Sequence, residues 1–573
     1  MNKLPYSYHT FYFPFVWDRD SLNYEGMVEL FEENPYWEDS DYQSRSEMKS
    51  EQWYRSVSNV SDELRFDYQC FQYFNIPARN AIYGCKEEIV RNFSFRPNGR
   101  MIKMQNAEYI IVKGDKSYKL TLNAINLKIY NTGIAIMIYE CENHDYRKIT
   151  DVKNINEYGR RIAAPFLPNS LDSFRLFADR LSIMVSGIEI AADDFIVHFQ
   201  QILTQPALDD RAKATSKAEY SYTDFKNEKQ GKSEHKYIQL TNVPRIIEHI
   251  LDYGAGDNER FTSCYETACQ DKTKIHIYPA LDDRMFVACA VLDAAYVEKL
   301  KGETYRNRMD TEDVYAYQTN YETACSLYEL AFIDTAGKVS SPCPLMLKNL
   351  LNTHVYSRWG AWGTFYAVTH HSMICVTSPK VLEPVVYPFL GEYCQIAALC
   401  LAQRASIVSF QAESNVLAPK MNDQEITTLE KTRQFMKLQR EYISFINQLC
   451  FFEVTSQEQG VEMYELLRSA LYIDKEKDVL ENQIEKMKDV TNSALDHDLN
   501  NYGFWFAVIA MIMAVTGPLT DKVSFFGDMD TNSFIGKPFY TLELICETVL
   551  IVILTMHAFG IIKLKFLKRK KGK

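Results

Sequence analysis

The sequence predicts an α+β protein with antiparallel sheets, a long helical stalk and two C-terminal transmembrane helices. Apolar and polar residues alternate at 107–140 and are interrupted by glycine-containing turns, a pattern typical of an antiparallel meander. Glycine and proline are nearly absent at 391–501, which indicates long helices. Two apolar segments follow, at 502–520 and 539–562, and each is long enough to cross a bilayer.

The overall composition is nevertheless that of a soluble protein. The 573 residues include 24% charged residues and carry a formal net charge of -12. An acidic chain lacks the broad basic face that nucleic-acid binding needs, so direct nucleic-acid binding is not expected. Thirteen cysteines without a CxxC motif predict buried thiols in a reducing compartment rather than disulfides or a zinc site. The N-terminus has no apolar segment of the signal-peptide type.

Residues 1–390 are expected to form a cytosolic α+β domain. Beyond the meander, strands are predicted at 274–280, 284–292, 326–334 and 364–377, and helices at 171–186 and 242–253. The polar segment 206–236 is expected to be a loop or an insertion.

The helical segment 391–501 contains apolar residues at steps of seven, four, three and seven. They are Ile473, Leu480, Ile484, Met487 and Ala494. This spacing is that of a helix that packs along a seam on other helices. Two interpretations fit it: a helix packed on its own domain, or, as we prefer, a stalk that runs into the first apolar segment.

The two apolar segments are interpreted as membrane spans. The first has no aspartate, glutamate, lysine, arginine or histidine between Leu499 and Thr520. The second contains Glu543, Glu547 and His557, so a buried core helix is the alternative, but its length and the run TVLIVILTM favour a span. A charge inside a span is costly unless it has a partner or water, which makes Glu547 a candidate pore residue.

The charges around the spans predict their topology. Seven basic residues crowd 563–573, and the positive-inside rule places such a tail in the cytoplasm. Two spans then return the preceding chain to the same side, so both termini are expected to be cytoplasmic. The link 521–538 becomes a short outside loop, in which Asp528 and Asp530 would favour cations at a pore mouth.

A single pair of spans cannot enclose a pore, so a homo-oligomer is expected. Small residues at helical spacing in the first span, namely Ala507, Ala510 and Ala514, would allow close packing between copies.

This order of segments resembles the CorA family of divalent-cation channels. The resemblance implies a ring, usually a pentamer, whose first spans line the pore and whose cytosolic domains gate it. The family's Gly-Met-Asn filter is replaced here by Thr516-Gly517-Pro518. Backbone carbonyls and an asparagine amide suit a hydrated cation, so the replacement puts selective magnesium transport in doubt. A constitutive CorA-type magnesium transporter remains the alternative function.

Six further motifs are similar to the divergent CorA-like membrane proteins encoded beside type III CRISPR systems in bacteria. They are HTFYFPFVWD at 9–18, NEYGRRIAAPF at 156–166, LDDRMFV at 281–287, RWGAWGTFYAVT at 358–369, AQRASIVSF at 402–410 and EVTSQEQGVEMYELL at 453–467. The resemblance implies an antiviral effector of the bacterial inner membrane. It also implies activation by a nucleotide second messenger, S-adenosylmethionine joined to AMP, which opens a pore or disrupts the membrane.

Such a messenger carries a phosphodiester, two adenines and a cationic sulfonium. A site for it needs guanidinium groups, aromatic faces and a carboxylate. The motifs supply these groups as Arg160, Arg161, Asp282, Asp283, Arg284, Arg358, Trp359, Trp362 and Tyr366. The alternative is structural: the aspartates tie Arg284 into an internal ion pair, the other arginines form similar pairs, and the aromatic residues pack in the core.

No catalytic motif stands out, so an enzyme is not expected and no catalytic residue, metal ligand or cofactor is assigned. His370 and His371 with Cys375 suggest a metal site, but neighbouring residues of a strand point to opposite faces. Polar residues at 453–462 are interpreted as hydrogen-bonding groups between packed helices. A membrane-anchored enzyme or adaptor without a pore is the third hypothesis.

Overall fold

The computed structural model describes residues 4–19, 21–40, 62–84, 89–99, 102, 104–160, 178–194, 243–256, 259–262, 271, 273–306, 321–337, 339–422 and 426–525. The chain divides into two compact units, Met1–Lys488 and Asp489–Lys573, which we call the first and second units.

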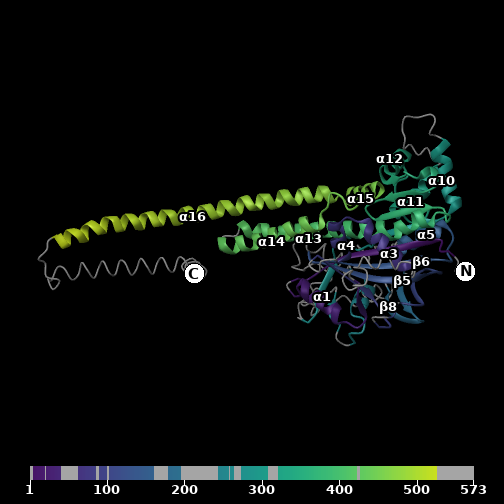
Figure 1. The fold of residues 1–573 in the computed structure, drawn as a ribbon, viewed down its shortest axis with the longest axis horizontal. Helices are drawn as coiled ribbons and strands as arrows, with labels where there is room; N and C mark the ends of the chain where they lie inside the picture. The colour runs from purple at the N-terminus through teal and green to yellow at the C-terminus, as the bar shows by residue number, and fades with distance from the viewer. Residues whose placement is uncertain are drawn as a thin grey trace, which may run out of the picture. The chain divides into compact units, whose positions relative to one another are not determined.

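The described strands of the first unit form one sheet (Figure 1). Its strands are β1 (Ser7–Trp17), β2 (Trp37–Asp39), β3 (Val90–Phe95), β4 (Ala107–Lys113), β5 (Lys116–Tyr130), β6 (Ile134–Asn143), β7 (Arg180–Val185), β8 (Ile188–Asp194), β9 (Phe261–Thr262), β10 (Ile275–Pro279), β11 (Phe286–Leu292), β12 (Val355–Tyr356), β13 (Phe365–Val368) and β14 (Ser372–Thr377). The main path through the sheet runs β12-β13-β14-β11-β1-β6-β5-β4-β7-β8.

Helices cover this sheet and continue beyond it. They are α1 (Tyr24–Glu33), α3 (Asp62–Tyr73), α4 (Ile76–Tyr83), α5 (Ile149–Gly159), α8 (Arg245–Leu251), α10 (Ala294–Arg306), α11 (Tyr321–Phe332), α12 (Pro344–His354), α13 (Cys394–Asn422), α14 (Thr428–Leu449), α15 (Glu458–Ala470) and α16 (Ile473–Phe525). A 3-10 turn η4 (Gly360–Trp362) and two π-helical turns, η5 (Leu382–Val386) and η6 (Phe389–Tyr393), complete the described elements.

Strand β1 lies in the middle of the sheet and is buried on both faces. It pairs antiparallel with β6 and with β11. Because successive side chains of a strand point to opposite faces, Phe11, Phe13 and Phe15 enter one core, whereas Tyr12 and Val16 enter a second core. Helices α13 to α16 complete the second core. The apolar motif at 9–18 therefore contributes side chains to both cores of the first unit.

The predicted meander is confirmed, but the sheet is mixed rather than antiparallel. Strands β4, β5 and β6 follow one another in antiparallel register. Strand β11, however, runs parallel to β14, with Val287 opposite Ser372. Parallel strands need a crossover connection, and helices α10, α11 and α12 supply it. The predicted strands at 274–280 and 284–292 are confirmed as β10 and β11.

Two other secondary-structure predictions are wrong. The segment 326–334 lies mostly in helix α11, where Ala324, Leu327 and Ala331 are buried at helical spacing. Short apolar runs fit either a strand or a helix, and tertiary packing decided for the helix. The predicted helix 171–186 ends in strand β7, and its first seven residues lie outside the described ones. The predicted helix at 242–253 is confirmed as α8, and the segment 206–236 lies outside the described residues.

The connection between strands β7 and β8 explains why the predicted helix 171–186 is wrong, because a two-residue turn joins these strands into a hairpin. Ser186 and Gly187 both have positive φ angles, 51° and 82°. Two such residues in succession form the type I′ turn that matches the twist of a hairpin. The Ser-Gly pair was therefore the signal for a hairpin at this position.

The long helices predicted after residue 391 are confirmed. Among the described residues, one helical stretch, Leu382–Met421, is long and apolar enough to cross a membrane, and 72% of its apolar window is buried inside the protein. Ile473, Leu480, Ile484 and Met487 are buried in the second core. The predicted seam thus packs on its own domain as far as Met487, as the first of the two interpretations stated.

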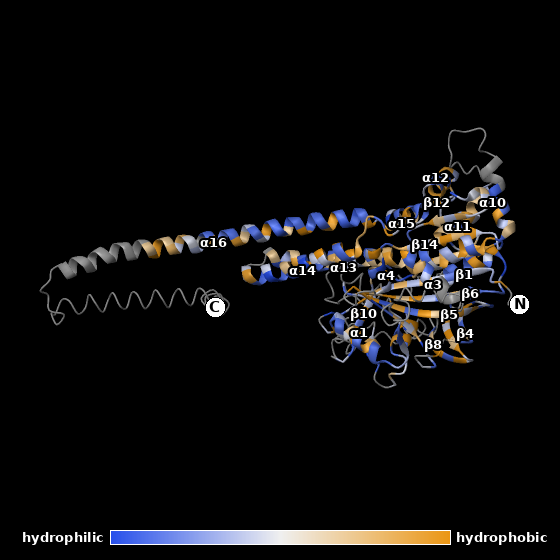
Figure 2. Ribbon diagram, in the orientation of Figure 1, coloured by the Kyte–Doolittle hydropathy of each residue, from blue (hydrophilic) through white to orange (hydrophobic). Residues whose placement is uncertain are grey.

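Helix α16 extends without interruption into the second unit. It contains the whole of the predicted first span, 502–520. Figure 2 shows a hydrophilic start of α16 and an apolar stretch near its last described side chains. Phe504, Trp505 and Phe506 are exposed, as are Ala507 and Ala510, and Ala514 lies further along the same helix. Asp528, Asp530, Glu547, the second span and the basic tail lie outside the described residues.

The cysteines of the described part agree with the prediction of buried thiols. All nine are free, and six of them are buried, including Cys289 and Cys375 in the sheet.

Glu392, in the π-helical turn η6, should make stability pH-dependent. Its side chain is buried, and burial raises its pKa from 4.5 to about 7. The folded state therefore holds a proton between pH 4.5 and 7 that the unfolded state has released, so stability falls as the pH rises through this window. Glu392→Gln should stabilise the protein at pH 8, by on the order of 2 kcal/mol, and have little effect at pH 5. Thermal unfolding at both pH values tests this, and an equal shift at both would contradict it.

Candidate functional site

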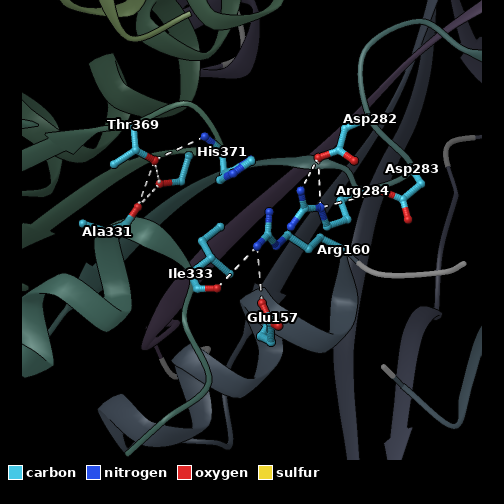
Figure 3. Close-up of polar contacts among 10 residues, drawn as sticks. Glu157, Arg160, Asp282, Asp283, Arg284, Ala331, Ile333, Thr369 and His371 are labelled. Carbon is cyan, nitrogen blue, oxygen red and sulfur yellow. Dashed lines mark hydrogen bonds and ion pairs between the residues drawn. The ribbon is translucent and has the colours of Figure 1, made fainter. Parts of the chain in front are cut away.

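Five segments that are far apart in the sequence meet at one polar cluster of the first unit. The cluster consists of Arg160, Asp282, Asp283, Arg284, His370, His371, Arg404 and Glu476, and we call it the arginine–histidine cluster. Figure 3 shows Arg160, Arg284 and Asp282 next to His371. Of the residues predicted from the sequence, the fold thus brings Arg160, Asp282, Asp283 and Arg284 together, whereas Arg161 lies outside the described residues.

Backbone hydrogen bonds hold the segments of the cluster in place. The Met285 N–H donates to the Arg160 carbonyl at 3.0 Å, and the Val287 N–H donates to the His371 carbonyl, also at 3.0 Å. The end of α5, the start of β11 and the turn before β14 are thereby fixed to one another. Because these three backbone segments are held together, the side chains of Arg160, Arg284 and His371 lie close to one another.

The two histidines lie in the turn between β13 and β14, not within a strand. The Thr369 hydroxyl accepts a hydrogen bond from the His371 N–H at 3.2 Å and donates one to the Ala331 carbonyl at 3.1 Å. The predicted strand 364–377 is therefore a hairpin, and the argument that adjacent strand residues face apart was wrong here. The imidazole rings of His370 and His371 lie 5.2 Å apart. Among the described residues, no group of three or more potential ligands is placed to hold a metal ion.

Both imidazoles are neutral at physiological pH. Burial lowers the pKa of His371 to about 3, and the charges of Arg160 and Arg284 act in the same direction. Burial and the charge of Arg404 lower the pKa of His370. A neutral imidazole can accept a hydrogen bond, and the Arg404 guanidinium lies 2.6 Å from His370 Nε2. The positive charge of the cluster therefore resides on its arginines.

The aspartates of the cluster form an ion pair with Arg284. Arg284 Nη2 lies 2.7 Å from Asp282 Oδ2, and Arg284 Nε lies 3.8 Å from Asp283 Oδ1. Burial and the neighbouring Asp282 raise the pKa of Asp283. Burial acts against ionisation of Asp282 too, but hydrogen bonds from Asp283 and Arg284 hold its pKa low. The structural alternative considered for these aspartates is thus the arrangement observed.

Arg160 links two helices in the interior. Its side chain is buried, and its Nη2 lies 3.4 Å from Glu157 Oε2 and donates to the Ile333 carbonyl at 3.3 Å. These contacts join the end of α5 to the end of α11. Arg160 therefore stabilises the fold, and its buried positive charge acts on His371.

Arg404 connects the cluster to the first turn of α16, a contact that sequence reasoning missed. Arg404 Nη2 lies 3.7 Å from Glu476 Oε1. The His370 Nδ1–H is placed to donate to the carbonyl of Ala470, at the end of α15, at 3.3 Å. The motif at 402–410 contained Arg404 as a signal, but nothing in the sequence indicated that its partner is Glu476.

The remaining predicted residues lie apart from the cluster, around β12, η4 and β13. The Arg358 guanidinium binds Glu462 and Glu458 of α15, both at 2.6 Å. Hydrogen bonds to these carboxylates raise the pKa of Arg358. Glu458 and Glu462 were predicted to form hydrogen bonds between packed helices, but their partner Arg358 lies between β12 and η4 and not on a helix. Arg358 is thus engaged in fastening α15 to the sheet.

The aromatic residues beside Arg358 have different environments. Tyr366 is buried, and the rings of Trp359 and Tyr366 meet edge-on at 6.1 Å. Trp362 is 78% exposed. Core packing therefore accounts for Tyr366 and for the partly buried Trp359, and Trp362 alone of the three presents an open ring.

Comparisons with known proteins gave no match: no protein-family model, curated protein or solved structure corresponds to the chain. In chemical terms, the cluster pairs three guanidinium groups with carboxylates around two neutral imidazoles, so an anion would bind here by displacing a carboxylate.

Proposed function

We propose that the protein is a membrane effector of type III CRISPR antiviral defence, gated by a nucleotide second messenger. In this proposal S-adenosylmethionine–AMP binds the first unit at the arginine–histidine cluster, and helix α16 transmits the event to a membrane pore. The contact between Arg404 and Glu476 supports the proposal, because it joins the arginine–histidine cluster directly to the helix that contains the apolar segment 502–520.

The messenger's phosphate would compete with the carboxylates that now occupy the arginines. The Arg284–Asp282 contact, at 2.7 Å, is a close charge-assisted hydrogen bond. The Arg404–Glu476 contact, at 3.7 Å, is too long for one. A phosphate therefore replaces Glu476 at a smaller cost than it replaces Asp282. Binding would free the first turn of α16 from Arg404.

The start of α16 is suited to respond to that release. Tyr472, directly before the helix, has a φ of 56°. A residue with a side chain is strained in this left-handed region, at a cost of about 1–3 kcal/mol. The surrounding contacts maintain the strain, and one of them is the His370 ring, whose centroid lies 5.7 Å from that of the Tyr472 ring. Loss of these contacts would let the junction between α15 and α16 relax.

The membrane part of the proposal rests on the sequence and on the exposed start of the apolar segment. Phe504, Trp505 and Phe506 are exposed on α16, and aromatic residues are typical of the membrane–water interface. Two spans per chain, a homo-oligomeric pore in the inner membrane and cytoplasmic termini complete the proposal. Asp528, Asp530 and Glu547 are its candidate pore residues.

Ion flux from liposomes tests the proposed function. The full chain is reconstituted, and flux is recorded without nucleotide, with S-adenosylmethionine–AMP, and with AMP alone as a control. We expect flux only with the conjugate. Flux under all three conditions would indicate a constitutive transporter of the CorA type. The absence of flux, in preparations that bind the conjugate, would indicate a membrane-anchored adaptor without a pore.

A further inference from the structure

A groove of about 990 Å³ lies between the ends of β1 and β10 and the helices α13 and α14. Clefts that hold small ligands usually measure about 300–1,000 Å³. Apolar side chains line it from both sides, among them Val16, Ala280, Val408, Leu417 and Leu438. The groove is therefore large enough for a nucleoside and apolar enough to bind one.

One wall of the groove carries an aromatic pair. His276 and Tyr278 lie two residues apart on β10, so their side chains share a face of the strand. Their rings are stacked, with centroids 5.4 Å apart and planes inclined by 26°. Tyr278 is 43% exposed although it lines the groove. An exposed ring held in place by a stacked neighbour is suited to bind a flat base.

Charged groups of both signs line the groove. Arg19 forms ion pairs with Glu413 of α13 and with Glu441 of α14. Lys420 and Lys437 also line the groove, and Lys437 is exposed. A ligand that carries both positive and negative groups finds a partner for each here.

Helix α13 runs from the cluster to the groove. Arg404 precedes Val408 by four residues, so both lie on one face of the helix. Ala412, which also lines the groove, lies eight residues beyond Arg404, about 12 Å along the helix axis. On the strand side, Ala280 of the groove is followed two residues later by Asp282 of the cluster. A molecule of dinucleotide size can contact both places at once.

We infer that this groove binds an adenosine moiety of the messenger, stacked on Tyr278, while the phosphate binds Arg284 and Arg404. The inference rests on the proposed function for the identity of the ligand. It adds a base-binding part to the site, centred on Tyr278, which lies outside the six sequence motifs.

Two groove variants test the inference by equilibrium binding of S-adenosylmethionine–AMP to the full chain. Tyr278→Ala should weaken binding about tenfold or more, because it removes the stacking surface, whereas Tyr278→Phe should bind like the wild type. Ala412→Trp should weaken binding at least as much by filling the groove, and Ala412 is exposed there, so the larger side chain does not overpack the core. Phe452→Ala is the matched control, since Phe452 is 84% exposed outside the groove.

The outcomes separate this inference from the proposed function. Wild-type binding in Tyr278→Ala and Ala412→Trp, together with weakened binding in Arg404→Gln, would overturn the groove and leave the messenger site in place. No binding of the conjugate to the wild-type protein would overturn both. Equal losses in Phe452→Ala and Tyr278→Ala would also count against the groove, because the effect would then not depend on position.

Discussion

Lys153→Met should lower the free energy of unfolding by about 3–5 kcal/mol, because it leaves a buried carboxylate without its counter-charge. The side chains of Lys153 and Glu329 are only 3% and 7% exposed, and Nζ lies 2.8 Å from Glu329 Oε2. Lys153 also donates to the Ser326 hydroxyl, and Glu329 accepts from the Gly337 N–H. The pair fastens α5 to α11, the two helices that Arg160 also joins.

Chemical denaturation of purified variants measures this loss. In the double variant Lys153→Met with Glu329→Leu, both charges are replaced by apolar groups, so much of the stability should return. Lys116→Met is the surface control, because Lys116 is 63% exposed in its pair with Asp151 and should change stability by less than about 1 kcal/mol. A similar small loss for Lys153→Met would mean that water solvates the interior pair.

Arg404→Gln should weaken binding of the conjugate about ten- to a hundredfold, the effect of losing a charge-assisted hydrogen bond. Glutamine retains hydrogen-bonding capacity toward His370 but lacks the charge that attracts a phosphate. Titration calorimetry gives the affinity, and the thermal midpoint measured without ligand shows whether the variant is folded as well as the wild type. Weaker binding at an unchanged midpoint marks Arg404 as a contact. Unchanged affinity would remove it from the site.

Glu476→Gln separates binding from transmission at the same contact. The substitution removes the carboxylate that competes for Arg404, so the conjugate should bind several-fold more tightly. Because the contact that the messenger is proposed to break is already weakened, the variant should also show ion flux without ligand. Glu485→Gln, further along α16, is the matched control. Wild-type affinity together with wholly ligand-dependent flux in Glu476→Gln would rule out this route of transmission.

The sequence by itself determined the features that depend on local periodicity. The meander β4–β5–β6 follows from alternation and from glycines in its turns, such as Gly133 with a φ of 84°. The helices after residue 391 follow from the lack of glycine and proline. The ion pair of Arg284 with Asp282 was also accessible, because its partners are two residues apart.

Only the tertiary structure decided which distant residues share a site. Arg160, His371 and Arg404 lie in three distant stretches of the sequence, and they meet because β11 pairs in parallel with β14 while α13 packs across the same sheet. The tertiary structure also buries Tyr366 and pairs Arg358 with Glu462 of α15, although the sequence suggested that both residues bind a ligand. The physical reason is that periodicity records which face of an element is apolar. It does not record which element that face will meet, because long-range pairing and core packing are settled by the whole chain at once.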